Sequence, residues 1–313
     1  MASLKEIKDR IGSVKNTLKI TSAMKMVASA KLHKAQAAIG NKLPYEQKLY
    51  RILAGMLQDD DLRKAMHDEL GFGMQEHSPV TLQDIHIDEL PVKERASRVA
   101  IVVYSSNSSL IGSFNANVIR RFNETVSDLY GRGYAAQDID VYAVGRKVAD
   151  AAVKNGFTLK GNFHDLADKP DYEKAADLAH DLVDSFADGV VSQVILIYNH
   201  FASTASQPTV RENYLPLALH DFDEGEEPVD YVLEPDAISL VKHLLPLVLL
   251  LKIYTVSLDA NAAEHAARTI AMQMATDNAE DLLSELTLAY NKGRQQAITA
   301  EILDLVGGMS AQE

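Results

Sequence analysis

The 313-residue sequence predicts an α/β protein in two parts: a long antiparallel coiled coil of the N- and C-terminal helices, and a central open α/β sheet domain. The first observation is that both ends carry long helical patterns. At 1.5 Å per residue the C-terminal pattern would reach on the order of 100 Å, whereas a core of this size is roughly 30–40 Å across. The second is that short β-branched runs alternate with helical patterns in the middle, which is typical of a parallel sheet.

The N-terminal helix is expected over residues 1–58. Ser3 and Glu6 have the spacing of a capping box, which places the start of the helix there. Gly40 and Pro44 predict a kink before the helical pattern resumes. Its first apolar residues are three and four apart, the heptad spacing of a coiled-coil seam: Leu4, Ile7, Ile11, Val14 and Leu18.

The C-terminal helix is expected over residues 237–313, with Gly307 and Gly308 ending it. The apolar run from Leu244 to Leu251 is too short to span a bilayer, which needs about 20 apolar residues, so it predicts a buried helical stretch. Further along, a ridge of alanines at every fourth position would let another helix approach closely. The ridge is Ala263, Ala267, Ala271, Ala275 and Ala279, and Leu288, Ile298 and Ile302 continue an apolar stripe.

The central α/β domain is expected over residues 96–220, with a Rossmann-like arrangement. Its buried strands are predicted at 99–104, 139–144 and 194–198, and an edge strand at 209–217 lies between Pro208 and Pro216. Helices are predicted at 114–130, 146–155 and 172–187. An acidic connection over 59–95 precedes this domain, and an acidic loop over 221–236 follows it.

The charge is distributed unevenly along the chain. Residues 1–51 hold eleven Lys and Arg against three Asp and Glu, so this segment carries +8 although the whole chain carries −13. A basic helix on an acidic protein indicates a partner with negative charge, such as nucleic acid, a lipid surface or an acidic loop of another protein. There is no cysteine, which excludes disulfides, thiolate nucleophiles and cysteine-bound zinc.

Motifs for chemistry are absent from the sequence. Neither glycine-rich phosphate-binding motif occurs, and the polar loop from Ser105 to Asn115 lacks their glycines and has no nearby lysine. We interpret that loop as a turn with capping residues. There is no H-E-x-x-H, and Glu264-His265 is better explained as packed or solvated helix residues than as a base. We therefore predict no catalytic, cofactor-binding or metal-binding residue.

The residues alone leave two other functions open. One is an α/β enzyme with helical arms for dimerisation, which would bind a nucleotide or substrate by itself. The other is a coiled-coil adaptor that binds an acidic partner, for example nucleic acid through residues 1–51.

Two strings in the terminal helices, Ile20-Thr-Ser-Ala-Met-Lys-Met-Val-Ala-Ser-Ala-Lys-Leu32 and Tyr290-Asn-Lys-Gly-Arg-Gln-Gln-Ala-Ile-Thr-Ala-Glu-Ile-Leu-Asp304, are specific enough to identify a family. Together with Ala275-Thr-Asp-Asn-Ala279, they closely resemble the gamma subunit of bacterial F-type ATP synthases. The Ile-Thr-x-Glu-x-x-Asp string from Ile298 is the most diagnostic. The resemblance covers nearly the whole chain.

This resemblance implies a non-catalytic subunit without a cofactor: the central-stalk rotor that couples proton-driven rotation of the c-ring to conformational changes of the catalytic beta subunits. The implied partners are the alpha and beta subunits, the epsilon subunit and the c-ring, and neither nucleic acid nor direct membrane insertion is expected. The implied location is peripheral, on the cytoplasmic face of the bacterial plasma membrane.

The resemblance also assigns partner-contact residues. Met24 and Lys25 match the neck region that faces an acidic loop of beta, and Arg294, Gln295, Thr299 and Glu301 match positions of the C-terminal helix that contact the hexamer. One departure concerns the family's loop Ser-Asp-Arg-Gly-Leu-Cys-Gly-Gly. Residues 106–113 here read Ser-Asn-Ser-Ser-Leu-Ile-Gly-Ser, so the charged pair is lost.

Overall fold

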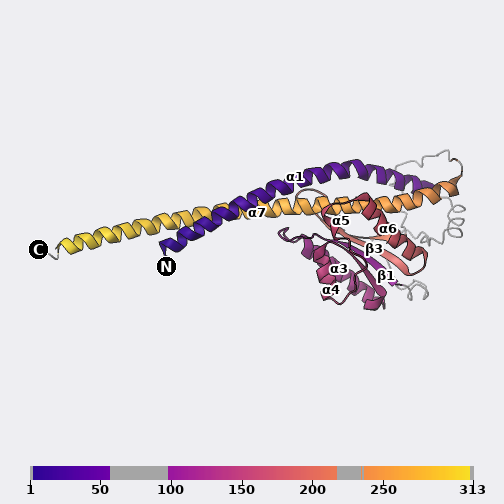
Figure 1. Ribbon diagram of the computed structural model, residues 1–313, viewed down its shortest axis with the longest axis horizontal. Helices are drawn as coiled ribbons and strands as arrows, with labels where there is room; N and C mark the ends of the chain where they lie inside the picture. The colour runs from indigo at the N-terminus through magenta and orange to yellow at the C-terminus, as the bar shows by residue number, and fades with distance from the viewer. Residues whose placement is uncertain (1–2, 57–97, 217–233, 235, 311–313) are drawn as a thin grey trace. The chain divides into compact units, whose positions relative to one another are not determined.

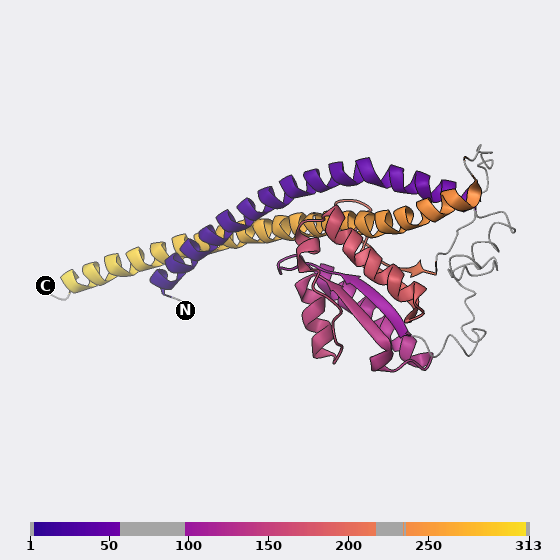
Figure 2. The ribbon, with the colours of Figure 1, turned by 45° about the vertical axis from the view of Figure 1, so that its right-hand side comes forward.

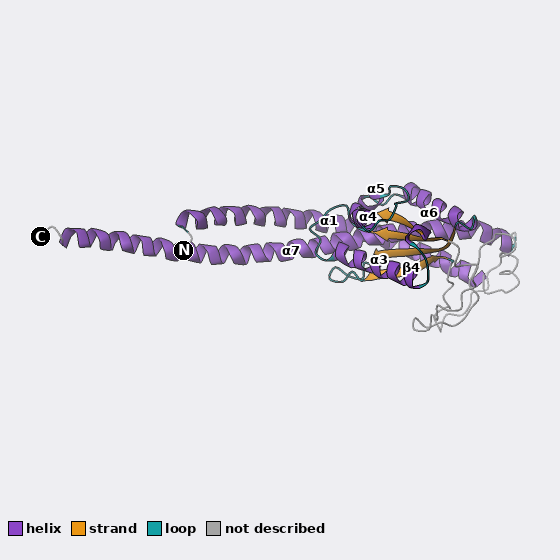
Figure 3. Cartoon of the chain, turned by 90° about the horizontal axis from the view of Figure 1, so that it is seen from below, coloured by secondary structure: helices purple, strands orange, loops and turns teal. Residues whose placement is uncertain are grey.

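The computed structural model describes residues 3–56, 98–216, 234 and 236–310 (Figure 1). The described chain divides into two compact units, Met1–Ala30 with Arg268–Glu313, and Lys31–Ala267. Figure 3 distinguishes helices from strands. In chain order the elements are α1 (Leu4–Met56), β1 (Arg98–Tyr104), α3 (Phe114–Gly131), a 3-10 turn (Ala136–Asp138), β2 (Ile139–Val144), α4 (Arg146–Lys154), α5 (His164–Asp168), α6 (Tyr172–Ala187), β3 (Val191–Asn199), β4 (Thr209–Leu215) and α7 (Ala237–Ser310).

Helix α1 begins as the sequence predicts. The backbone N–H of Glu6 donates to Ser3 Oγ at 3.2 Å, and the N–H of Ser3 donates to Glu6 Oε2 at 2.9 Å. These reciprocal bonds confirm the capping box. The helix continues through Gly40 and Pro44 to Met56 without interruption. Pro44 lacks an N–H, so one intrahelical hydrogen bond is missing, but packing along the helix outweighs that loss.

In the first unit, α1 and α7 form an antiparallel pair. The hydroxyl groups of Thr21 and Thr276 lie 3.0 Å apart, and Leu4 packs so close to Gly293 that a Cβ at Gly293 would lie 3.1 Å from Leu4 Cδ2. From the first contact to the second, α1 goes back by 17 residues and α7 goes forward by 17 residues. The two contacts therefore fit one antiparallel register. The predicted seam residues of α1 in this unit are all buried or half-buried, which confirms the heptad pattern.

Two expectations for the C-terminal end were wrong. Helix α7 does not stop at Gly307 and Gly308 but runs to Ser310, because a glycine inside a helix costs only about 1 kcal/mol relative to alanine. Leu288, Ile298 and Ile302 do not continue the seam, since they are 70%, 44% and 55% exposed. The inward positions of α7 are instead Met272, Thr276, Ala279, Leu283, Leu286, Tyr290, Gly293 and Ala297.

The position of α1 explains part of this exposure. Leu4 is the first residue of α1, and it packs at Gly293. The turns of α7 that carry Ile298 and Ile302 therefore extend past the start of α1. Leu288 lies between the seam residues Leu286 and Tyr290, on the outer face of the helix.

The second unit is built on a four-stranded sheet with the order β2-β1-β3-β4. Figure 2 shows strands of this sheet with helices beside them. Strand β1 pairs in parallel with β2 and with β3, and β4 pairs antiparallel with β3. All four strands lie where the sequence predicts them, and β4 is an edge strand between Pro208 and Pro216. The predicted helices are α3, α4 and α6 within one residue at each end, while the short helix α5 was not predicted.

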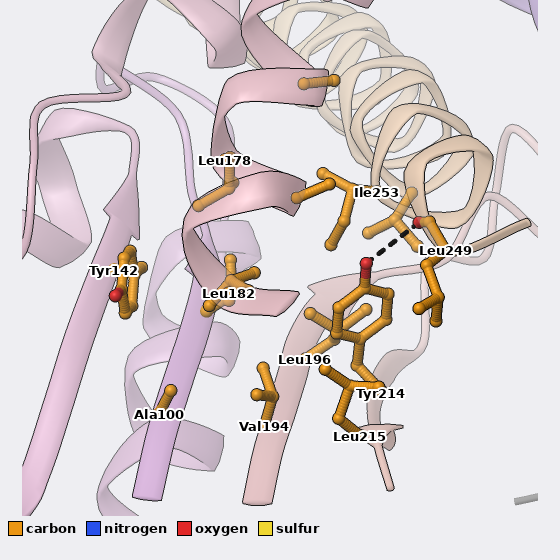
Figure 4. Close-up of a cluster of buried hydrophobic side chains, with 14 of the residues drawn as sticks. Ala100, Tyr142, Leu178, Leu182, Val194, Leu196, Tyr214, Leu215, Leu249 and Ile253 are labelled. Carbon is orange, nitrogen blue, oxygen red and sulfur yellow. Dashed lines mark hydrogen bonds between the residues drawn. The ribbon is translucent and has the colours of Figure 1, made fainter. Parts of the chain in front are cut away.

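Both faces of the sheet are covered. On one face, α3 and α4 pack against β1, β2 and β3 through a core that includes Phe122 and Phe157. On the other face, α6 and the α1 and α7 segments of this unit close a larger core (Figure 4). Within it, the Tyr214 hydroxyl donates to the Leu249 carbonyl of α7 at 3.0 Å.

The apolar run of α7 belongs to this larger core. By length and composition alone, α7 would pass as a membrane-crossing helix. However, Leu245, Val248 and Leu249 are buried against the sheet. The run is therefore a buried helical stretch, as predicted. The expected division into five segments stays a prediction, and the acidic connection and most of the acidic loop lie outside the described residues.

Candidate partner-binding surface

The first candidate surface lies on α1 in the first unit, at the predicted contact residues Met24 and Lys25. Both side chains are half-buried beside the seam. Ile20, Met24 and Val27 are four and three residues apart, so they share one face of the helix. Ile20 and Val27 are 60% and 58% exposed. Sequence reasoning missed these two residues, although their spacing from Met24 was a signal for a second apolar face.

The second candidate surface lies on α7 in the same unit. Arg294, Gln295, Thr299 and Glu301 are all exposed, and the Thr299 hydroxyl donates to the Gln295 carbonyl at 2.9 Å. Gln295 is seven residues from both Leu288 and Ile302, so these three residues share a face. Because both apolar neighbours are exposed, Gln295 lies within an apolar surface that faces solvent in the single chain.

The structure keeps these two surfaces apart. Thr21 lies opposite Thr276, so Lys25, one turn further along α1, is at the level of Met272 on the antiparallel helix. Arg294 is 22 residues beyond Met272, which is roughly 33 Å along the helix. The six predicted contact residues therefore form two separate surfaces, one at each end of the paired segment, and not one site.

A third place to examine is the carboxyl edge of the sheet in the second unit. Open α/β sheets bind ligands outside the carboxyl ends of the strands, where the strand order reverses. Here that point is beside β1, which has β2 on one side and β3 on the other. The loop Ser105–Asn115, interpreted above as a turn with capping residues, follows β1 directly.

The amides at the start of α4 are already bonded by this loop. The N–H of Arg146 donates to Asn107 Oδ1 at 2.9 Å, and that of Val148 donates to Ser105 Oγ at 3.0 Å. A helix N-terminus binds an anion through free N–H groups, and these are occupied. Gly145, just before α4, has φ +107°, and a Cβ there would lie 2.1 Å from the Ser105 carbonyl oxygen, so only glycine allows this close approach.

The space outside β1 is filled by α7. What remains is a cavity of about 10 Å³, lined by Tyr104, Ser105, Phe114, Ala167, Ser257, Ala260, Asn261 and Glu264. That is barely the volume for one water molecule, whereas small-molecule sites measure roughly 300–1,000 Å³. This cavity between described residues is therefore too small for a nucleotide. Glu264 and His265 are both buried in α7, so of the two alternatives, packed or solvated, the structure has the packed one.

With this geometry in hand, comparison with known proteins decides the family. A family model described as ATP synthase matches residues 3–312. The ATP synthase gamma chain of Phocaeicola vulgatus is 51% identical over 315 residues, covering 99% of this chain and all of the relative. The chain belongs to the ATP synthase gamma-chain family. The gamma chain of a Bacteroides fragilis strain is 50% identical over the same length. Family membership makes the chain a subunit of an ATP synthase.

Solved structures agree with this gamma-chain fold. A chain from the Euglena gracilis mitochondrial ATP synthase, in a structure of OSCP, F1 and c-ring, aligns with a TM-score of 0.61 at 18% identity, covering 99% of this chain and 94% of that one. A chain from the Tetrahymena thermophila central stalk and c-ring aligns with a TM-score of 0.52 at 20% identity, covering 82% and 99%. At these identities the likeness concerns the fold. The six contact residues stay predictions.

Proposed function

We propose that this gamma-family chain is the central-stalk rotor of an F-type ATP synthase. In this proposal, the paired helices turn inside the hexamer of alpha and beta subunits, and the sheet domain is the foot that rests with the epsilon subunit on the c-ring. The proposal is supported by relatives named gamma chain and by the likeness of the fold to chains of an ATP synthase central stalk and an ATP synthase rotor.

The observation that carries the proposal is the exposed apolar surface on the first unit. Monomeric proteins rarely leave large apolar patches in water, and such patches mark binding surfaces. On α7, Leu288, Ile298 and Ile302 are exposed together, and on α1, Ile20 and Val27 are. These side chains project from the outer faces of the helix pair, so a partner that surrounds the pair would cover them. The bore of a hexamer is such a partner.

Charge supports the assignment of the beta subunit to the α1 surface. Lys5, Lys8, Lys15 and Lys19 are exposed, and Lys25 is half-buried next to Met24. Opposite charges across an interface speed association and fix its orientation more than they add affinity. An acidic loop of beta would meet these lysines at one angle of rotation only. The attraction between the opposite charges would stabilise that angle and would be absent at the others.

The mechanism follows from this angular dependence. Each orientation of the rotor contacts the three beta subunits differently, so it stabilises a different conformation of each. The nucleotides bind and react on beta, and the gamma chain contributes only differential contact. In this sense the chain is a non-catalytic subunit, and the filled crevice at its sheet agrees with that role.

The same proposal gives the location. The foot is a peripheral part on the cytoplasmic face of the plasma membrane, where it meets the c-ring without entering the bilayer. The apolar run of α7 favours this, because its side chains Leu245, Val248 and Leu249 are used in the core of the sheet domain.

Reconstitution tests the proposal. We expect the purified chain to show no ATPase activity, and we expect a mixture with cognate alpha and beta subunits to form an active ATPase complex. The control is the alpha and beta mixture without the chain. Failure to form an active complex, while all three subunits are folded by circular dichroism, would exclude the proposed function.

A further inference from the structure

We propose that the carboxyl edge of the sheet, where related folds bind ligands, serves here as a mechanical joint. In this joint Asp259 of α7 holds the loop after β3, and Phe201 of that loop locks α7 against rotation about its own axis. The inference rests on the proposed function, because only a chain that is turned through its sheet domain needs such a joint. All its residues belong to the second unit.

Asp259 binds two consecutive residues of the loop. Its Oδ1 accepts the backbone N–H of Phe201 at 2.9 Å, and its Oδ2 lies 2.6 Å from His200 Nδ1. The Asp259 side chain is only 16% exposed. Hydrogen bonds to an ionised and partly desolvated carboxylate are short and roughly twice as strong as neutral ones. Asp259 therefore fixes both the position and the direction of the loop.

Phe201 is the side chain that this arrangement positions. It packs against Leu32 of α1 and the alanines Ala262 and Ala266 of α7. It also packs against a second cluster, which contains Ile111 of the loop after β1 and Phe114 at the start of α3. The ring thus lies between α1, α7 and the carboxyl edge of the sheet. The small alanines leave room for it, and at Ala263 the alanine ridge faces this loop region and not a helix.

The contacts on α7 lie on opposite flanks of the helix. The Asn261 side chain donates to the Ala167 carbonyl of α5 at 2.9 Å. On the same flank, Ser257 Oγ lies 3.4 Å from the Tyr104 hydroxyl of β1, although its shorter hydrogen bond, at 2.7 Å, is to the Ile253 carbonyl of α7 itself. Asp259 is two residues from each, which is about 200° around the helix. Apolar packing is non-directional and alone permits a helix to roll. Directional bonds on both flanks oppose rolling in either sense.

The experiment uses the complete ATP synthase in inverted membrane vesicles. ATP hydrolysis is measured together with the membrane potential that it generates, reported by an oxonol dye, which responds whichever ion is pumped. We expect Phe201→Ala and Asp259→Ala to keep the wild-type rate of hydrolysis and to lose membrane potential per ATP hydrolysed. The variant Asp259→Asn, which keeps the shape and the acceptor for the Phe201 N–H, should lose less.

The matched control is Phe157→Ala. Phe157 is buried in the core on the opposite face of the sheet, against Phe122, and is not part of the clusters around Phe201. Its truncation removes the same phenyl ring and destabilises the same unit by leaving a cavity. If loss of potential merely followed loss of stability, Phe157→Ala would lose at least as much as Phe201→Ala, and that result would overturn the joint.

A covalent link between positions 200 and 259 distinguishes loss of the joint from a general loss of stability. The chain has no cysteine, so the double variant His200→Cys with Asp259→Cys carries the only two thiols of this subunit. We expect the reduced double variant to lose potential and a short bis-maleimide to restore it. The single variant His200→Cys, treated in the same way, controls for labelling of other subunits. Absence of rescue in cross-linked complexes would contradict the inference.

The outcomes distinguish this inference from the function on which it rests. Wild-type potential per ATP in Phe201→Ala and Asp259→Ala would overturn the joint alone. Pumping by a complex that lacks the chain entirely would overturn the proposed rotor as well.

Discussion

The two units of the chain differ in what holds them together. In the sheet unit, β1 and β2 are almost completely buried, and helices cover both faces of the sheet. In the helix-pair unit, the seam contains Thr21, Thr276, Ala279 and Gly293, and large apolar side chains face outward. The sheet unit thus buries its apolar surface within itself. The helix pair leaves much of its apolar surface for a partner.

This difference has a physical reason in the proposed function. A seam of small and polar residues gains little from burial, because the hydrophobic contribution scales with apolar area at roughly 25 cal/mol per Å². It brings the two helices close together and keeps the pair thin. Stability of the pair then depends on what surrounds it, whereas the stability of the sheet unit does not.

The largest effect is expected for Phe122→Ala in the sheet unit. Phe122 has no exposed surface and packs edge-to-face on Phe157, with ring centroids 5.7 Å apart. Removing a buried phenyl ring costs about 3–5 kcal/mol through lost transfer energy and the cavity. Urea unfolding, followed by hydrogen exchange of the β1 peptide, measures the loss. A change below about 1 kcal/mol would contradict the self-sufficient core.

Leu288→Ala is the matched variant in the helix pair. Leu288 is 70% exposed, so its truncation should change the free energy of unfolding of the isolated chain by less than about 0.5 kcal/mol. The same variant should weaken assembly with alpha and beta subunits. Equal losses of stability from Phe122→Ala and Leu288→Ala would erase the contrast between the units.

A smaller effect is expected from the threonine pair of the helix seam. Thr276→Val removes the hydrogen bond that Thr21 Oγ1 accepts, while the Thr21 hydroxyl still donates to the Leu18 carbonyl at 3.2 Å, so the expected loss is that of one hydrogen bond, about 0.5–1.5 kcal/mol. The double variant Thr21→Val with Thr276→Val should recover that loss, because both polar groups are removed together. Hydrogen exchange of peptides from residues 4–30 reports the stability of the pair.

The double-mutant cycle decides whether the two hydroxyls interact. Additive losses in the two single variants and the double variant would mean that each hydroxyl bonds only within its own helix. Thr276 is also 2.8 Å from the Met272 carbonyl, so that result is physically possible. It would leave the antiparallel register resting on the contact of Leu4 with Gly293.

Most of the regular structure could be predicted from the sequence. Strands β1 to β4 stand out because β-branched residues cluster in short runs, and the N-terminal seam because its spacing repeats every seven residues. Ending α7 at Gly307 failed because the cost of a glycine is small compared with that of a proline. The exposure of Ile298 could not be read from periodicity, since it depends on where α1 begins.

The candidate sites were harder to predict than the fold. The resemblance supplied Met24, Lys25, Arg294, Gln295, Thr299 and Glu301, but spacing along one helix says nothing about which level of the other helix lies opposite. The contact of Asp259 with His200 joins residues 59 positions apart. No local pattern marks such a pair, and Phe201 sits in a polar loop that gives no sign of packing.

The smallest expected effect concerns the charge of Glu46 in the sheet unit. Glu46 lies on α1 and is nearly fully buried, with Lys252 and Glu212 nearby. Burial raises the pKa of Glu46; Lys252 opposes this rise, and the negative charge of Glu212 adds to it. Lys252 is already 3.1 Å from Glu212, so it is shared between the two carboxylates.

A raised pKa has a definite sign for stability. The contribution of Glu46 to the free energy of unfolding is fully present below its unfolded pKa of 4.5, where the carboxyl is neutral. It is lost as the pH rises through the folded pKa and the buried carboxyl ionises. Glu46→Gln, which stays neutral, should therefore gain stability relative to the wild type as the pH rises from 4.5 towards neutrality. Urea unfolding across this range measures the difference, with Glu280→Gln on the exposed face of α7 as the control. A difference that is constant with pH would mean that Lys252 compensates the charge of Glu46 completely, and the sheet unit would then hold its buried carboxylate without cost.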